Sequence, residues 1–140
     1  SDVSQRMVDF ARRNAQRAGV AAAIEFHGGD ALERAAPVLS ADLPGTLLVN
    51  PPYGERIDAA GKAGVGRGEP GLPGDFYARL ASHWKRAYTG HPAGWTAHML
   101  SPDMKLPGTM RLKATRRVPL WNGPIECRLF RFDLVAGSAR

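Results

Sequence analysis

The feature that most constrains this fold is the stretch LLVNPPYGER at residues 47–56, where an apolar run leads straight into Asn50, Pro51 and Pro52. Proline fixes φ and lacks a backbone N–H, so two prolines in succession end a regular element and set the shape of the corner that follows. GTLLVN, before the corner, is apolar at successive positions, as in a central parallel strand that helices cover on both faces. We therefore expect a buried strand that ends in a rigid polar corner.

Helical and strand patterns alternate along the rest of the chain. A helix is expected from Ser4 to about Ala18, followed by Gly19 as its C-terminal cap. The later elements are a short strand over 22–27, one or two helical turns over 30–39, a helix over 75–87, a strand over 94–101, and two β-rich runs within 114–134 that Asn122-Gly123 joins as a hairpin. Such alternation predicts an α/β fold with a mostly parallel sheet and a C-terminal antiparallel hairpin.

The segment DAAGKAGVGRGEPGLPG, residues 58–74, is rich in glycine and poor in large apolar side chains. This composition predicts a flexible loop. Lys62 and Arg67 in this loop have two interpretations, contact with RNA phosphates or ordinary surface charge that keeps a loop soluble.

The net charge and the cysteine content limit the binding partners and the cellular compartment that we expect. A formal net charge of +6 and a pI of about 10.1 fit either a nucleic-acid partner or a merely basic soluble protein. Cys127 has no second cysteine to pair with and lies in a strand pattern, so we expect a packing residue and a reducing, cytoplasmic location. The sequence has no membrane-spanning run, and its four histidines lack metal-site spacing, so neither a membrane nor a metal is expected.

The corner at Asn50 offers two hydrogen-bond acceptors in nearly fixed relation, the side-chain amide oxygen of Asn50 and the carbonyl of Pro51. Both can accept from an exocyclic amino group and turn its lone pair toward an electrophile, without a strong general base. Tyr53 can stack on the face of a base that has been flipped out of its helix. Because Asn and Pro are also ordinary turn residues, a purely structural corner stays open at this point.

The chain resembles the class I S-adenosylmethionine-dependent amino-methyltransferases, in which an Asn/Asp-Pro-Pro-aromatic corner follows the fourth strand. SDVSQRMVDFARRNAQRAGV, GGDA, LLVNPPYGERI and LWNGPIECRLFRFDL together resemble the catalytic domain of THUMP-containing bacterial 23S ribosomal RNA guanine-N2 methyltransferases. The resemblance spans nearly all of residues 1–140 and implies a Rossmann-like sheet. It implies transfer of a methyl group from S-adenosyl-L-methionine to the N2 amino group of a guanine in 23S ribosomal RNA.

The resemblance also implies roles for individual residues. Asp2 matches the acid that binds the cofactor ribose, and Asp30 matches the acceptor for the cofactor adenine. Asp2 has a second interpretation as an acid at a helix N-terminus, and Asp30 as a helix cap. The remaining site residues are Asn50, Pro51 and Tyr53 as catalytic groups, Asn50 also beside the cofactor, and Arg56 as an RNA contact or the partner of Glu55 in a surface ion pair.

In one respect the sequence departs from the family. The family domain begins with a strand and a glycine-rich loop that residues 1–140 do not contain, and its strand order is 3-2-1-4-5-7-6. We therefore expect a C-terminal fragment of a methyltransferase domain, with a gap in the middle of its sheet that a missing N-terminal segment fills. Unpaired strand edges are costly, so we expect the isolated chain to bind S-adenosylmethionine weakly or not at all.

Two other functions stay open on the sequence. The first is another amino-methyltransferase with the same corner, acting on adenine in nucleic acid or on glutamine in a release factor. The second is a basic RNA-binding fragment without catalysis.

Overall fold

A computed structural model of the chain describes residues 1–52 and 75–137. The chain divides into two compact units, Ser1–Ala36 and Pro37–Arg140. Tyr53, Glu55, Arg56, Lys62 and Arg67, and with them the expected loop over 58–74, lie outside the described residues. The elements of the first unit are α1 (Gln5–Arg17) and the 3₁₀ turn η1 (Ala21–Ala23), and those of the second are β1 (Gly45–Val49), α2 (Phe76–Ala87), β2 (Trp95–Ser101), α3 (Leu106–Met110), β3 (Ala114–Asn122) and β4 (Ile125–Leu134).

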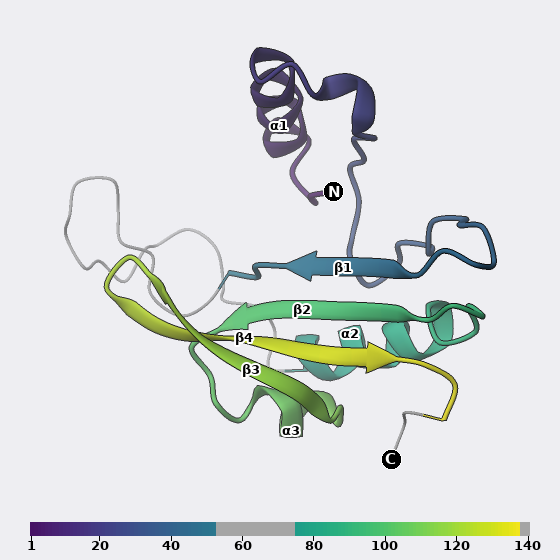
Figure 1. Cartoon of the computed structure of the whole chain (residues 1–140). Helices are drawn as coiled ribbons and strands as arrows, with labels where there is room; N and C mark the ends of the chain where they lie inside the picture. The colour runs from purple at the N-terminus through teal and green to yellow at the C-terminus, as the bar shows by residue number, and fades with distance from the viewer. Residues whose placement is uncertain (53–74, 138–140) are drawn as a thin grey trace. The chain divides into compact units, whose positions relative to one another are not determined.

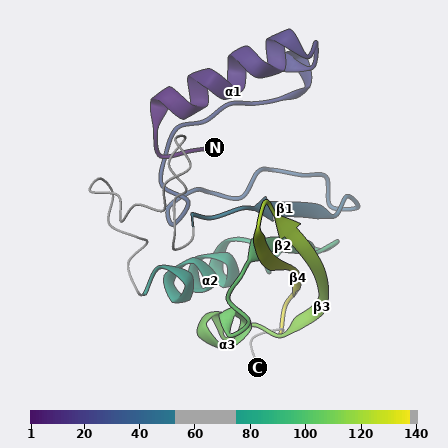
Figure 2. The ribbon, with the colours of Figure 1, turned by 90° about the vertical axis from the view of Figure 1, so that its left-hand side faces the viewer.

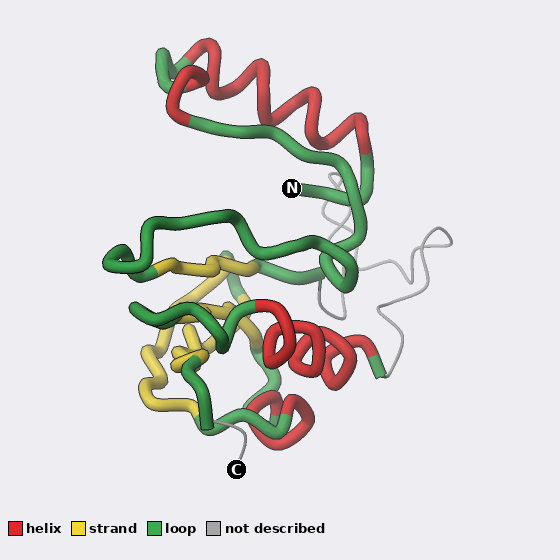
Figure 3. The backbone as a smooth tube through the Cα atoms, turned by 90° about the vertical axis from the view of Figure 1, so that its right-hand side faces the viewer, coloured by secondary structure: helices red, strands yellow, loops and turns green. Residues whose placement is uncertain are grey.

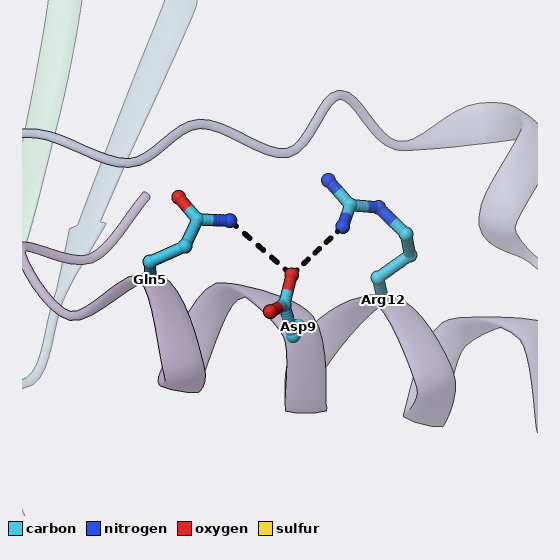
Figure 4. Close-up of polar contacts among 3 residues, drawn as sticks. All are labelled: Gln5, Asp9 and Arg12. Carbon is cyan, nitrogen blue, oxygen red and sulfur yellow. Dashed lines mark hydrogen bonds and ion pairs between the residues drawn. The ribbon is translucent and has the colours of Figure 1, made fainter.

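The first unit is built on α1, which confirms the predicted helix. Gly19, with a φ of 74°, follows the helix as predicted. Along α1, Asp9 Oδ1 accepts hydrogen bonds from Gln5 Nε2 at 3.2 Å and Arg12 Nη1 at 3.0 Å (Figure 4). The Arg12 guanidinium also lies 5.4 Å from the centre of the Phe26 ring. This cation–π contact ties the segment after η1 to the helix.

One prediction in the first unit is wrong, and the predicted one or two helical turns are met only by a single turn. The expected strand over 22–27 is a 3₁₀ turn and irregular chain, because its only strand-like pairing is a single parallel bridge between Asp2 and Gly28. The expected helix over 30–39 is a single turn, in which Glu33 N–H donates to Asp30 C=O at 3.1 Å. A strand needs a neighbour to pair with, and a helix this short seldom repays its nucleation cost. The chain from residue 24 to 44 therefore contains no helix or strand (Figure 3).

The second unit is a mixed four-stranded sheet in the order β1-β2-β4-β3 (Figure 1). β1 and β2 are parallel, whereas β4 runs antiparallel to both β2 and β3. This arrangement confirms the predicted α/β sheet with a C-terminal hairpin. The hairpin turn lies one residue later than predicted, at Gly123-Pro124, because Asn122 still pairs with Ile125. Gly123 has a φ of 59°, which suits the first central position of a type II′ turn, and Pro124 has the fixed φ of the second.

The core of the second unit lies between one face of the sheet and helices α2 and α3, which cover the same side (Figure 2). β2 alternates buried and half-buried residues along its length, with Trp95, Ala97, Met99 and Ser101 facing the helices. The other buried core side chains are Leu80, Ala81, Trp84, Leu106, Met110, Phe130, Phe132 and Leu134. Cys127 is also fully buried, which confirms its prediction as a packing residue. The sequence did not predict α3, whose five residues include both proline and glycine.

The opposite face of the sheet is less covered than the sequence indicated. Leu48, which points away from the helices because it alternates with Leu47 and Val49, is 77% exposed. β1 pairs with β2 alone among the described strands and therefore lies at the sheet edge. The prediction that helices cover both faces of a central β1 is thus wrong for the residues that the structure describes.

Candidate active site

Asn50 and Pro51 lie at the carboxyl end of β1. Val49 is paired with Met99 of β2, so continuing the parallel register places Asn50 beside Leu100 and Pro51 beside Ser101. Asn50 is exposed and Pro51 is buried. The Asn50 amide makes no hydrogen bond to any described residue, while the buried proline anchors the chain directly behind it. The corner therefore exposes the Asn50 amide oxygen to solvent while the buried proline holds the backbone next to it. This amide lies at the carboxyl ends of the parallel strands, where ligands of such sheets bind.

Asp2 and Asp30 lie in the first unit, on segments that the structure joins. Asp2 N–H donates to His27 C=O at 3.2 Å, and Gly29 N–H donates to Asp2 C=O at 3.0 Å. These bonds surround the parallel bridge between Asp2 and Gly28 and bring Asp2 within two residues of Asp30 along the paired segment. The two predicted cofactor residues are therefore neighbours at the ends of parallel segments.

Both carboxylates already have a local partner. Asp2 Oδ1 accepts from Ser4 N–H at 2.7 Å, directly before α1, and Asp30 Oδ1 accepts from Leu32 N–H at 2.9 Å. Both are local turns in which a carboxylate accepts from the N–H two residues later, and neither is a helix cap, because Ser4 is the N-cap of α1 and residues 30–39 contain no helix. Each side chain is exposed, and its second carboxylate oxygen has no hydrogen bond to described residues, so both retain an acceptor for a ligand.

The two halves of the predicted site lie in different units. Asp2 and Asp30 belong to Ser1–Ala36, whereas Asn50 and Pro51 belong to Pro37–Arg140. Their convergence on one cofactor stays a prediction, as do the roles of Tyr53, Arg56, Lys62 and Arg67, which fall outside the described residues.

The carboxyl end of β2 carries polar residues that the sequence did not single out. Ser101 is buried, and its Oγ accepts from Asp103 N–H at 3.1 Å, while Asp103 Oδ1 accepts from Lys105 N–H at 2.8 Å. Burial, with the nearby Asp103 charge as a second cause, raises the pKa of the Tyr77 phenol. The only sequence signal was SPD directly after a strand, which ordinary turns share.

No group of three or more His, Cys, Asp or Glu side chains in the described ranges is arranged to hold a metal ion. None of the helices in residues 1–52 and 75–137 has the length and apolar character needed to cross a membrane.

The strand order and the corner together define a class of protein, the Rossmann-like methyltransferases. The order β1-β2-β4-β3 is the 4-5-7-6 half of the expected family sheet, with the Asn-Pro-Pro corner after the strand that corresponds to strand 4. The fold agrees with two solved structures. SMU.472, described as a putative methyltransferase complexed with SAH, has a TM-score of 0.67 and 24% identity, and the match covers 94% of this chain and 30% of that one.

The second solved structure is a protein from Clostridium difficile 630 described as a possible methylase. It has a TM-score of 0.67 and 27% identity over 94% of this chain and 30% of its own length. The family itself is shown by sequence, because residues 1–131 match the RMKL-like methyltransferase domain. The chain belongs to this family, which confirms the predicted resemblance and makes it a methyltransferase domain by descent.

Curated relatives carry a more specific name. Ribosomal RNA large subunit methyltransferase K/L from Shewanella baltica strain OS155 is 36% identical over all 140 residues, and the protein of the same name from Shewanella frigidimarina is 34% identical over the same length. This chain spans 17% of the length of each of these relatives.

Proposed function

We propose that this chain contributes the target-amine site of an enzyme that transfers a methyl group from S-adenosyl-L-methionine to the N2 amino group of a guanine in 23S ribosomal RNA. The observation that carries the proposal is the exposed Asn50 amide, fixed by a buried proline at the carboxyl end of β1. The name of the curated relatives supports ribosomal RNA as the substrate class. Such a substrate also fits the cytoplasmic location expected from the single cysteine.

The chemistry follows from the two acceptors of the corner. Asn50 Oδ1 and the Pro51 carbonyl accept hydrogen bonds from the two hydrogens of the guanine amino group, which turns its lone pair toward the methyl donor. The bond from nitrogen to the methyl carbon forms as the carbon–sulfur bond breaks, and the amine then gives one proton to water. Preorganised acceptors act mainly by positioning and by stabilising the charge that develops on nitrogen. Tyr53 stacks on the flipped base in this scheme.

S-adenosyl-L-methionine supplies the activated methyl group when it is bound. The first unit fits the adenosine part of this cofactor, because Asp2 and Asp30 lie on joined segments and each keeps one exposed carboxylate oxygen without a partner among the described residues. One carboxylate would accept from the ribose hydroxyls and the other from the adenine amino group. SMU.472, solved with SAH, supports this choice of cofactor.

A further segment of the same protein is proposed to complete the site. β1 has one unpaired edge among the described strands, and Leu48 beside it is 77% exposed. An apolar parallel strand is normally paired and covered on both sides. A strand that pairs with this edge would supply the backbone that holds the methionine end of the cofactor.

The test uses the complete natural polypeptide in which this sequence occurs, with tritiated S-adenosylmethionine and three substrates: 23S ribosomal RNA, DNA and a translation release factor. The proposal expects label in the RNA, recovered after digestion as N2-methylguanosine. Asn50→Ala should slow the reaction by on the order of 100-fold. Asn50→Asp retains an acceptor and should keep more activity, while Asp42→Ala, an exposed change before β1, serves as the control.

Label confined to the release factor, or recovered from RNA or DNA as N6-methyladenosine, would contradict the proposal. Equal rates for the wild type and Asn50→Ala would contradict the assigned role of the corner. RNA binding without any label would favour the non-catalytic RNA-binding alternative.

A further inference from the structure

The β3–β4 hairpin extends past the carboxyl ends of β1 and β2, where the candidate active site lies. The last pairing of β2 with β4 joins Ser101 to Arg128, whereas β4 begins at Ile125 and remains paired with β3 to Asn122. Three residues of β4 therefore continue beyond β2, an overhang of about 10 Å at the usual rise per residue. Figure 1 shows the hairpin continuing past the arrowheads of β1 and β2.

The overhang presents a large aromatic side chain to solvent. Trp121 is 67% exposed, although the other two tryptophans, Trp84 and Trp95, are buried. It pairs with Glu126, so its indole does not lie over any core residue of β2. A tryptophan that leaves two thirds of its surface in solvent gains little from folding, and such side chains are enriched at recognition surfaces.

Basic side chains share the face of Trp121. Arg117 and Trp121 are four residues apart on β3 and thus point to the same side, about 13 Å apart along the strand. Arg128 lies on this face of β4, where its Nη1 donates to Glu126 Oε1 at 2.9 Å. Residues 113–134 contain five basic and two acidic side chains, so the hairpin as a whole is positively charged.

The location of the hairpin relative to Asn50 indicates which kind of molecule could contact both. β3, which carries Trp121, is three strands from β1 in the sheet, a lateral distance of about 14 Å, and all these elements belong to the same unit. The charge and the exposed indole of the hairpin favour a partner that is negatively charged and carries flat groups at successive positions. Single-stranded nucleic acid has both properties.

We infer that Trp121, with Arg117 and Arg128, forms a platform on which a nucleotide flanking the target base stacks while the target lies at Asn50. The base would stack on the indole. The guanidinium of Arg117, which lies 5.8 Å from the centre of the Phe130 ring, and that of Arg128, which donates to Glu126, would contact the neighbouring phosphates. This inference rests on the proposed function and names a second contact for the same substrate, a single-stranded segment of RNA.

The test uses the 140-residue chain and a short single-stranded RNA of ribosomal sequence. Stacking on Trp121 should quench the long-wavelength part of the fluorescence, because Trp84 and Trp95 are buried and emit at shorter wavelength. Trp121→Ala should remove that quenching and weaken RNA binding by roughly 5- to 100-fold, the range for loss of one stacked base. Trp121→Phe should restore much of the affinity.

Leu120→Ala is the matched control, because Leu120 is 41% exposed on the adjacent position of the same strand and points to the other face. It should leave RNA affinity within about twofold. Arg117→Met should lower the salt dependence of binding by about one phosphate contact. Trp121 is exposed, and circular dichroism of its variants checks that the fold is kept.

Unchanged RNA affinity in Trp121→Ala, or fluorescence of the wild type that RNA does not quench, would overturn the inference. Quenching by an unrelated acidic protein but not by RNA would also overturn it. The two proposals can fail separately. Quenching without methyl transfer in the complete polypeptide would reject the enzyme function alone, and methyl transfer without quenching would reject the platform alone.

Discussion

Gly45 lies directly opposite Trp95 in the parallel pair that holds β1 against β2. A Cβ atom at Gly45 would be 2.2 Å from Cδ2 of the Trp95 ring, closer than real atoms approach. Trp95 cannot simply turn away, because its ring packs edge-on against Tyr88 with centroids 4.9 Å apart. The absence of a side chain at residue 45 therefore allows the strand that carries Asn50 to pair with the sheet.

Gly45→Ala should be strongly destabilising. The added methyl group must push the Trp95 ring or separate β1 from β2, at a cost of about 1–3 kcal/mol or more for an overpacked core. Urea unfolding of the chain measures this as a lower free energy of unfolding. Gly90→Ala is the control, because a Cβ there meets nothing within 4 Å. Equal stability of the two variants would show that β1 does not pack on Trp95 as described.

Gly108→Ala should have the opposite effect. Gly108 lies in α3, is exposed, and has open space where a Cβ would point. Alanine in a helix is favoured over glycine by about 0.5–1 kcal/mol, largely because it restricts the unfolded chain. A small increase in the free energy of unfolding is expected in the same urea experiment. A decrease would mean that α3 needs backbone freedom at this position.

The ionisation of Tyr77 should respond to pH in a defined direction. Burial, assisted by the Asp103 charge, raises the pKa of Tyr77 above the ordinary value of 10.0. The folded state then keeps its proton longer than the unfolded state, so this group's contribution to stability is complete below pH 10 and is lost as the pH rises through the folded pKa. The phenolate absorbance of the wild type minus that of Tyr77→Phe measures this titration.

Asp103→Asn separates the two causes of that shift. Removing the charge should lower the pKa of Tyr77 partway toward its ordinary value, and burial should keep it raised. A pKa that does not move would exclude the carboxylate as a cause, and one that returns completely would exclude burial.

Cys127 should report unfolding of the sheet. Its side chain has no exposed surface and lies within β4, so a thiol reagent reaches it only when the β4 pairing opens. We expect the native thiol to react much more slowly than the thiol in urea-unfolded chain. Gly45→Ala should accelerate the reaction, whereas Gly90→Ala should not. A fast reaction in the native wild type would contradict the burial of Cys127.

Sequence reasoning succeeded where local signals and tertiary packing agree. The helical spacing of Phe76, Leu80 and Trp84 predicted α2, and the β-rich runs on either side of residue 123 predicted the hairpin. The corner at Asn50 was predicted from two prolines, whose effect on the backbone does not depend on the rest of the chain. Its place at the carboxyl end of a parallel strand is what the structure shows.

The failures concern elements that depend on neighbours. The segment over 22–27 has strand-like residues, but among the described residues its backbone neighbours only the Asp2 segment, so a single bridge forms in place of a strand. β1 has the apolar composition of a central strand, yet Leu48 is exposed. The composition of a strand shows which side chains could be buried, but it does not show which other elements cover them. Ser101, Asp103 and Tyr77 were missed because their significance lies in the parallel register that brings the end of β2 beside the end of β1.

The two-residue turn at Gly123-Pro124 has a consequence for how such an enzyme can change its substrate. Side chains alternate between faces along β3, so one residue inserted at the turn would shift the pairing and send the indole of Trp121 to the far side of the ribbon. The helices, the core and the amide at residue 50 would be untouched by that insertion. On the proposed function and the inferred stacking role of Trp121, the RNA contact at the tip of the ribbon can therefore evolve independently of the corner at Asn50.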